Sequence, residues 1–205
     1  MTPLLAGFVL GFSVAASFGP INLFALSSGL RYGFWPAYGV GVGAAVADGS
    51  YAFLGGLGAA ALFTGGAKGW FQMLGGAALV FIAVGMATRR PKEHGHEQRA
   101  APGFGRSFTV ALGATLANPI TVVYWTAVFA GVVPKLEVSR LEALTLLPAG
   151  VVCGTVVWAT LLAVGSAFAG RYVNQRVLSW LSLASALTIA GFGVWFIVGG
   201  VRTIA

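Results

Sequence analysis

The sequence predicts an all-α membrane protein with six transmembrane helices. Of the 205 residues, 58% are hydrophobic and only 8% are charged, whereas a soluble domain carries about 25% charged residues. The charged residues gather in a few short patches and leave long apolar runs between them. No run shows the ~10-residue alternation of polar and apolar residues that a membrane β-barrel requires. A soluble fold and a barrel are therefore both excluded.

Six runs reach the ~20 residues that a helix needs to cross the hydrocarbon core. We expect helices because a lone span must satisfy its own backbone hydrogen bonds. No Lys or Arg precedes the first run, which is longer than the ~7–15-residue apolar core of a signal peptide, so we expect a retained helix. The runs are residues 3–30, 32–67, 69–88, 107–134, 143–170 and 177–201.

The basic residues predict the orientation in the membrane. Six spans place both termini on one side, and the side with more Lys and Arg faces the cytoplasm. We therefore predict both termini outside and the 89–106 loop inside. The net charge of +7 follows this rule, so the expected partner is the lipid bilayer and not nucleic acid. The predicted inner set is Arg31, Arg89, Arg90, Lys92, Arg99, Arg106, Arg171 and Arg176, and the outer set is Lys68, Lys135, Arg140 and Arg202.

The loop at 89–106 divides the chain into two halves. We predict a first three-helix repeat over 1–88, a cytoplasmic polar loop over 89–106, and a second three-helix repeat over 107–205. The loop holds both histidines, His94 and His96, beside Glu93 and Glu97. These groups either bind a metal weakly or belong to a flexible linker, and the linker is favoured because the spaced ligand set of a metal site is missing. We predict no metal and no cofactor.

The first span of each half carries a proline at a corresponding position. Residues 15–21 read Ala-Ala-Ser-Phe-Gly-Pro-Ile, and residues 114–120 read Ala-Thr-Leu-Ala-Asn-Pro-Ile. Three spans per half give the two halves opposite orientations. In secondary transporters with inverted repeats, a pair of Gly/Pro-interrupted spans marks the binding site. The sequence therefore predicts two broken helices that face one central site.

The chemistry of each break predicts what the site binds. Proline interrupts a helix and is favoured at the first position of a new one, after a Gly or Asn cap. A helix that restarts in mid-membrane exposes unpaired N–H groups and the positive end of its dipole, which attract a carboxylate. The alternative is a pair of ordinary proline kinks, which membrane helices tolerate.

Asp48 is the one ionisable residue deep inside a span. An ionised Asp at the bilayer centre costs about 2.5–3.5 kcal/mol, so we expect it to face the interior of the bundle. Asp48 could bind a substrate amino group, carry a coupling proton, or make a structural hydrogen bond to a neighbouring Ser, Thr or Asn. Small residues share its helical face: Ala37, Gly41, Ala44, Ala52 and Gly55.

The glycines and the single cysteine indicate how the helices pack and which thiol chemistry is excluded. Pairs with the GxxxG spacing, which allows close helix packing, indicate a compact bundle, and the small-residue faces leave a homodimer open. The single cysteine, Cys153, excludes an internal disulfide and a paired-thiol redox site. The pairs are Gly7 with Gly11, Gly39 with Gly43, and Gly150 with Gly154.

These motifs together resemble the lysine-exporter (LysE/RhtB) family of bacterial amino-acid exporters. The resemblance rests on Ser-Phe-Gly-Pro-Ile-Asn-Leu at 17–23, Gly-Leu-Arg-Tyr-Gly at 29–33, Gly-Val-Gly at 39–41 with Asp48, and Ala-Asn-Pro at 117–119. Length, span number and the central polar loop match over essentially the whole chain. Phe18 stands where many members have proline, and Ile21 where the lysine-exporting branch often has glutamine.

The resemblance implies a multi-pass protein of the bacterial inner membrane that exports amino acids or related small solutes, driven by the proton or the membrane potential. Such a protein is not an enzyme. The alternative is a metal-ion or other small-solute exporter of the same superfamily; a purely structural subunit would need neither broken helices nor a buried acid. The expected substrate-binding residues are Gly19, Pro20, Asn22, Asp48, Asn118 and Pro119, with Asp48 also the candidate for proton coupling.

Overall fold

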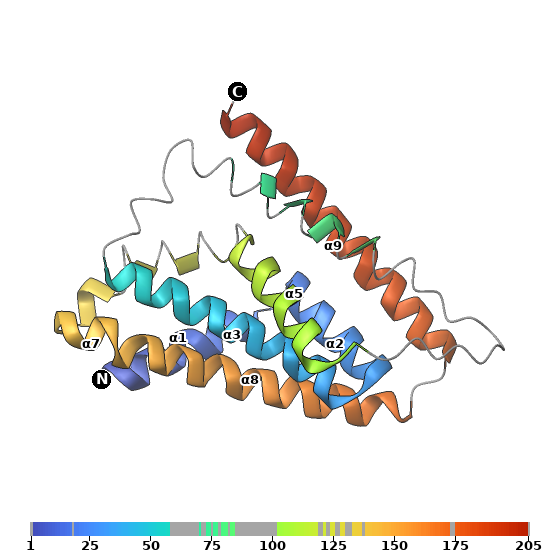
Figure 1. Ribbon diagram of the computed structural model, residues 1–205, viewed down its shortest axis with the longest axis horizontal. Coiled ribbons are helices and arrows are strands. Elements are labelled where there is room, and N and C mark those ends of the chain that lie inside the picture. The colour runs from blue at the N-terminus through green and yellow to red at the C-terminus, as the bar shows by residue number, and fades with distance from the viewer. Residues whose placement is uncertain are drawn as a thin grey trace.

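The computed structural model is helical throughout its described part, as the sequence predicts (Figure 1). Besides the α-helices it has one short 3-10 turn, and no strand occurs among the described residues. The predicted loop histidines His94 and His96, and Phe18 and Pro119, lie outside these residues. The structure describes residues 2–17, 19–57, 70, 73, 74, 76, 77, 79–81, 83, 84, 102–118, 121, 124, 125, 128, 129, 133–136, 138–172 and 175–204.

The first span is broken where the sequence predicts. Helix α1 runs over Pro3–Ala16 and α2 over Pro20–Tyr32. The two helices are bent by 73° at the break. Gly19 is the cap of α2 and Pro20 its first residue, which is the position where a proline costs no hydrogen bond. The prediction of a helix that restarts at Gly19-Pro20 is therefore confirmed.

A single glycine turns the chain from α2 into α3. Helix α3 runs over Phe34–Gly56 and begins directly after Gly33. Gly33 has a φ of 87°, in the left-handed region that side chains with a Cβ avoid. The tight turn sends α3 back along the bundle and carries Asp48 to its interior.

A second helix end lies at the other predicted break. Helix α5 runs over Phe104–Leu116 and ends at Ala117. The N–H of Asn118 donates to the carbonyl of Thr115 at 3.1 Å, which closes the last turn. Thr121 is helical again, so the described residues show that α5 ends before Asn118.

The remaining elements are a 3-10 turn, η2, at Val133–Leu136, and helices α7 at Arg140–Leu144, α8 at Leu146–Gly170 and α9 at Gln175–Ile204. Ser139 starts α7 with a capping box: Glu142 N–H donates to Ser139 Oγ at 3.3 Å, and Ser139 N–H donates to Glu142 Oε2 at 2.9 Å. These bonds satisfy backbone donors that a helix start leaves open. Figure 1 shows α9 crossing the other helices at an angle.

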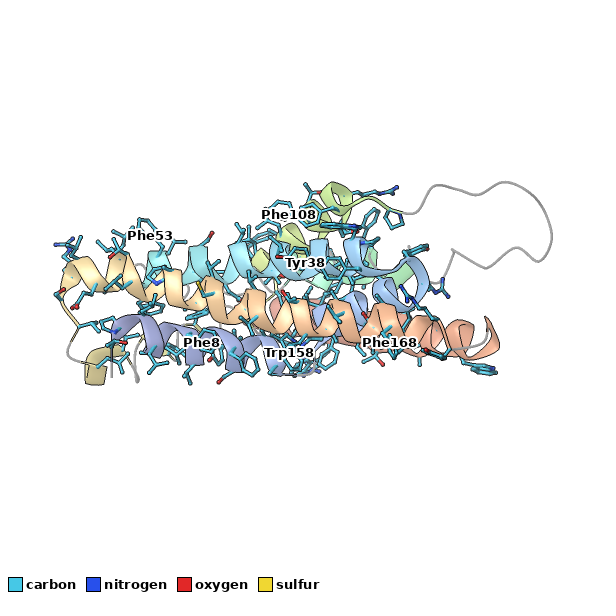
Figure 2. All side chains as sticks on the ribbon, turned by 90° about the horizontal axis from the view of Figure 1, so that it is seen from below. Phe8, Tyr38, Phe53, Phe108, Trp158 and Phe168 are labelled. Carbon is cyan, nitrogen blue, oxygen red and sulfur yellow. The ribbon has the colours of Figure 1, made fainter. Side chains whose placement is uncertain are left out.

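Glycines bring α1 and α8 into backbone contact. A Cβ added at Gly7 would overlap the carbonyl oxygen of Leu147, and one at Gly154 would overlap that of Phe8. Contacts advance in the same direction along both helices, so α1 and α8 are parallel. Figure 2 shows Phe8 of α1 on the same side of the bundle as Trp158 and Phe168 of α8. Two of the predicted GxxxG pairs thus form one helix–helix interface.

The third GxxxG pair lies between α3 and α5. A Cβ at Gly39 would meet the carbonyl oxygen of Phe104 at 2.6 Å, and one at Gly43 would overlap that of Phe108. Helices α3 and α5 are therefore parallel as well. In contrast, α3 and α8 are antiparallel, because Gly41 faces Ala159 whereas Gly49, further along α3, faces Val152. Helices at corresponding places in the two predicted halves thus run in opposite directions.

Two helices among the described residues are long and apolar enough to cross a membrane, Arg140–Gly170 and Ala186–Thr203. The bent pair of α1 and α2, taken together as one broken span, is a third. Helix α3 has 23 residues, but it is not one of these candidate spans, because its glycines and Asp48 lower its hydropathy. An all-α membrane fold is confirmed. The count of six spans and the division at 89–106 stay predictions, since most of that loop lies outside the described residues.

Four basic residues of the described part lie at two ends of the bundle. Arg31 lies at the end of α2, Arg106 in the first turn of α5 and Arg171 at the end of α8. These three ends come together, since Leu30 contacts Gly170, and Gly39 near the start of α3 contacts Phe104. Arg140 lies at the opposite end of α8, in α7. This separation follows the predicted charge asymmetry; which end faces the cytoplasm stays a prediction.

The packing of α1 on α8 generates a test of stability. Gly150→Ala places a methyl group against the carbonyl oxygen of Leu4, so we expect it to lower the free energy of unfolding by about 1–3 kcal/mol. Gly165→Ala on the same helix is the control, because its added Cβ meets nothing within 4 Å. Thermal unfolding in detergent measures both. Equal melting temperatures for the two variants would contradict the close α1–α8 contact.

Candidate functional site

A cavity of about 130 Å³ lies where the break of the first span meets α3, α5 and α8. One water needs only ~10–15 Å³ of such space, so the cavity has room for a small solute. Its wall is mostly apolar, with a few polar groups from segments far apart in the sequence. Besides the residues discussed below, it is lined by Val14, Ala15, Ser17, Ile21, Ala25, Thr121, Tyr124, Ala159 and Leu162.

The cavity collects the site residues that the sequence predicts. Gly19, Pro20, Asn22, Asp48 and Asn118 all line it, although they come from two helices, α2 and α3, and from the two breaks. Pro119, the sixth candidate, lies outside the described residues. Their shared location is observed, and their contact with a substrate stays a prediction.

Asp48 is buried and held by two donors. Only 4% of its surface is exposed. The indole Nε1 of Trp125 donates to Oδ1 at 3.1 Å, and the hydroxyl of Thr155 lies 3.5 Å from Oδ2. Sequence reasoning expected a Ser, Thr or Asn partner and missed the indole. A tryptophan in the middle of an apolar run was the available signal, because a buried indole N–H needs an acceptor.

Thr155 connects Asp48 to the first helix. Its hydroxyl also lies 3.2 Å from the carbonyl oxygen of Gly11. A hydroxyl has one proton, so it donates to one of these two acceptors at a time. Thr155 therefore donates to Asp48 only when its hydroxyl does not donate to the carbonyl of Gly11. Its hydrogen bond does not satisfy the carboxylate at all times.

The charge of Asp48 has no cationic partner in the described wall of the cavity, which contains no Lys, Arg or His. A buried ionised carboxylate is costly unless it is paired as well as hydrogen-bonded. Two neutral donors do not supply that pairing. Asp48 therefore requires either a proton or a cation from outside the described residues.

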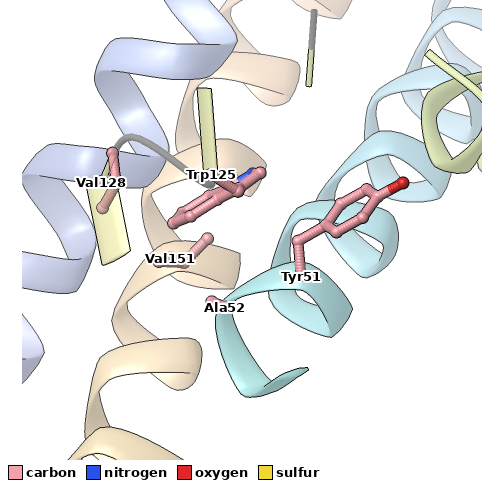
Figure 3. Packing of buried hydrophobic residues seen from close by; sticks show 5 residues of the cluster. All are labelled: Tyr51, Ala52, Trp125, Val128 and Val151. Atoms are coloured by element: carbon pink, nitrogen blue, oxygen red, sulfur yellow. The ribbon is translucent and has the colours of Figure 1, made fainter. Parts of the chain in front are cut away.

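The small-residue face of α3 divides into two parts. Ala37, Gly41 and Ala44 line the cavity as predicted. Ala52, in contrast, packs in a hydrophobic cluster with Tyr51, Trp125, Val128 and Val151 (Figure 3).

Gly55 extends this second part, because a Cβ there would overlap the ring of Phe129. Ala52 and Gly55 thus leave room for the segment around Trp125 to pack against α3, which brings the indole to Asp48.

Asn22 holds the break together. Its Nδ2 donates to the carbonyl of Ala15 at 2.6 Å and to that of Ser17 at 2.7 Å. Its Oδ1 accepts from Nε1 of Trp158 at 3.1 Å. The amide thereby satisfies carbonyls that the end of α1 leaves open and ties the break to α8. Asn22 lines the cavity, but its two donors serve the protein.

The start of α2 opens into the cavity without a cap. Gly19 is extended, with φ −146° and ψ −179°, and no side chain caps the helix. A Cβ added at Gly19 would meet nothing within 4 Å. The N–H groups of Ile21 and Asn22 lie in the first turn, where a helix offers no acceptor. The positive end of the α2 dipole therefore faces open space.

Thr115 adds a polar group that the predicted site did not include. Its side chain is 3% exposed and lines the cavity, yet its Oγ1 has no hydrogen-bond partner among the described residues. An unsatisfied buried hydroxyl costs about 1–3 kcal/mol. Sequence reasoning places Thr115 near the second break but has no means of seeing that its hydroxyl stays unpaired.

Comparisons with known proteins agree with this arrangement. The sequence profile of the LysE type translocator family matches residues 12–200. A protein of Bacillus subtilis (strain 168) named "Putative amino acid efflux protein YcgF" is 25% identical over 209 aligned positions, covering 100% of this chain and 99% of its own length. No solved structure matches the chain.

The role of Asn22 at the break is testable by stability. Asn22→Ala leaves the carbonyls of Ala15 and Ser17 without their donor, so we expect the free energy of unfolding to fall by about 1–3 kcal/mol. Ser50→Ala is the matched control, since its hydroxyl bonds only the carbonyl of Val46 within its own helix. Thermal unfolding in detergent measures the stability of both variants. An Asn22→Ala protein as stable as the control would show that the hydrogen bonds of Asn22 do not stabilise the break.

Proposed function

The chain belongs to the LysE type translocator family, and from this we propose that it exports amino acids or related small solutes across the bacterial inner membrane. The observation that carries the proposal is the polarity of the cavity. A buried carboxylate, with no cationic partner in the described wall, lines the same space as an uncapped helix start. These two groups complement the ammonium and the carboxylate of a zwitterion.

The carboxylate of the substrate would bind at the start of α2. The N–H groups of the first turn and the positive dipole end favour an anion there, and Gly19 leaves room for it.

Asp48 would bind the ammonium group or a proton. A carboxylate that carries a proton has lost the charge that attracts an ammonium group, so the two exclude each other. Binding of substrate at one side of the membrane and of a proton at the other would then couple export to the proton gradient. The absence of a fixed cation from the described cavity wall supports this exchange.

The proposed transport cycle is alternating access between two inverted three-helix halves, with both termini outside the cytoplasm. Support comes from the antiparallel course of α3 and α8 and from the two parallel pairs, α1 with α8 and α3 with α5. Each pair joins one helix from each half. A change of bend at the two breaks would open the cavity first to one side and then to the other.

Asp48→Asn tests the coupling residue. The amide keeps an oxygen for Trp125, so folding should persist, but it neither carries a proton nor attracts an ammonium group. We expect transport to fall about 10–100-fold, since hydrogen bonds to charged groups contribute about 1.5–3 kcal/mol, and dependence on a pH gradient to vanish. The measurement is movement of a panel of radiolabelled amino acids in proteoliposomes, with and without an imposed pH gradient.

Two outcomes of that experiment would contradict the proposal. Wild-type activity in the Asp48→Asn variant would remove Asp48 from the mechanism. Movement of divalent metal ions, without movement of any amino acid, by the wild-type protein would favour a metal-ion exporter of the same superfamily.

Gly19→Val tests the anion end of the cavity. The extended backbone accepts valine, and its side chain would occupy the open space beside the start of α2. We expect transport to fall at least about tenfold with little change in melting temperature, because the lost contact is to the substrate. Gly103→Val is the control: Gly103 caps α5 in an extended conformation and also faces open space, outside the cavity. Equal activity of the two variants would exclude substrate from the start of α2.

A further inference from the structure

We infer that Thr115 and Asp48 together form an ammonium-binding subsite at the C-terminal end of α5, which fixes the orientation of the substrate in the cavity. The inference deepens the proposed function and rests on it. It adds a substrate-contacting residue, Thr115, and a requirement that the substrate carry a primary amine.

The unpaired hydroxyl of Thr115 is the first observation. Most helical hydroxyls in the described part donate back to a carbonyl of their own helix; Thr160, for example, donates to Val156 at 2.8 Å and Thr188 to Ala184 at 2.9 Å. Thr115 makes no such bond, although it is buried and lines the cavity. A polar atom left open in this position is satisfied when a ligand occupies the cavity.

The register of α3 and α5 is the second observation. The two helices are parallel, with Gly39 against Phe104 and Gly43 against Phe108. Tyr51, one turn beyond Asp48, donates its hydroxyl proton to the carbonyl of Leu116. Asp48 therefore lies level with the last turn of α5, which carries Thr115. The two side chains line the cavity at the same depth from neighbouring helices.

The sign of the local charge decides which end of the substrate binds here. The last turn of α5 presents the negative end of a helix dipole, and Asp48 adds a carboxylate. A substrate carboxylate would be repelled by both. An ammonium group has three N–H donors, which can reach the Asp48 carboxylate and Thr115 Oγ1 together. Thr115 thus accepts a hydrogen bond from the amine.

This subsite orients the substrate across the cavity. The amine binds between α3 and α5, and the carboxylate points to the uncapped start of α2. The side chain then faces the small apolar residues of the wall. A solute without an amine would lack both contacts at the α5 end, and an N-alkylated amine would lose one of its donors.

Thr115→Val and Thr115→Ser test the inference. Valine keeps the shape and removes the hydroxyl, whereas serine keeps the hydroxyl. In proteoliposomes, the substrate is the panel amino acid that the wild-type protein moves fastest. The competitors are its amide, which keeps the amine, and the carboxylic acid that lacks the amine. We expect Thr115→Val to raise the KM of the amino acid and the inhibition constant of the amide about tenfold, to leave that of the acid unchanged, and Thr115→Ser to restore the wild-type values.

Stability supplies an independent readout. Replacing an unpaired buried hydroxyl by a methyl group of the same shape is neutral or stabilising, so the melting temperature of Thr115→Val should equal or exceed that of the wild type. A lower melting temperature would mean that the hydroxyl has a structural partner, and would overturn the inference. An inhibition constant of the acid that rises as much as that of the amide would overturn it too. Unchanged KM and inhibition constants in Thr115→Val would overturn the subsite alone. Failure of the wild-type protein to move any amino acid would overturn the proposed function and the subsite with it.

Discussion

A carboxylate buried in an apolar helix bundle needs partners, and this requirement organises the centre of the molecule. Asp48 draws its donors from Trp125 and Thr155, and Thr155 in turn reaches the backbone of α1 at Gly11. Since these groups lie on different segments, α1, α3, α8 and the segment around Trp125 must meet at one depth. The cavity lies at that meeting point because the donors surround Asp48 without enclosing it.

Glycine makes this convergence possible. Lipid tails are as apolar as the helices, so helices associate in a membrane through close packing and hydrogen bonds. The contacts of Gly7 and Gly154 between α1 and α8, and of Gly39 and Gly43 between α3 and α5, bring backbones within touching distance. Each pair joins one helix from each of the two predicted halves. The same packing that stabilises the bundle therefore links these predicted halves around the cavity.

The break in the first span gives the cavity its polarity. Asn22 satisfies the open carbonyls at the end of α1, whereas nothing caps the start of α2. Negative groups consequently gather on α3 and α5, and a positive helix end faces them from α2. In the function that we propose, a zwitterion binds across this asymmetry in one orientation, and competition between its ammonium group and a proton for Asp48 connects binding to coupling.

Residues near in sequence were enough to predict the all-α class, the break at Gly19-Pro20 and the inward position of Asp48, because the bilayer acts on backbone and charge within a single segment. The partners of Asp48 were not predictable in this way: Trp125 and Thr155 are 77 and 107 residues distant. The periodicity of α3 shows one small-residue face, but only the packing of neighbouring helices divides it between cavity and core. Whether a hydroxyl such as that of Thr115 is satisfied depends on which atoms the folded chain brings within hydrogen-bond distance, and no single segment carries that information.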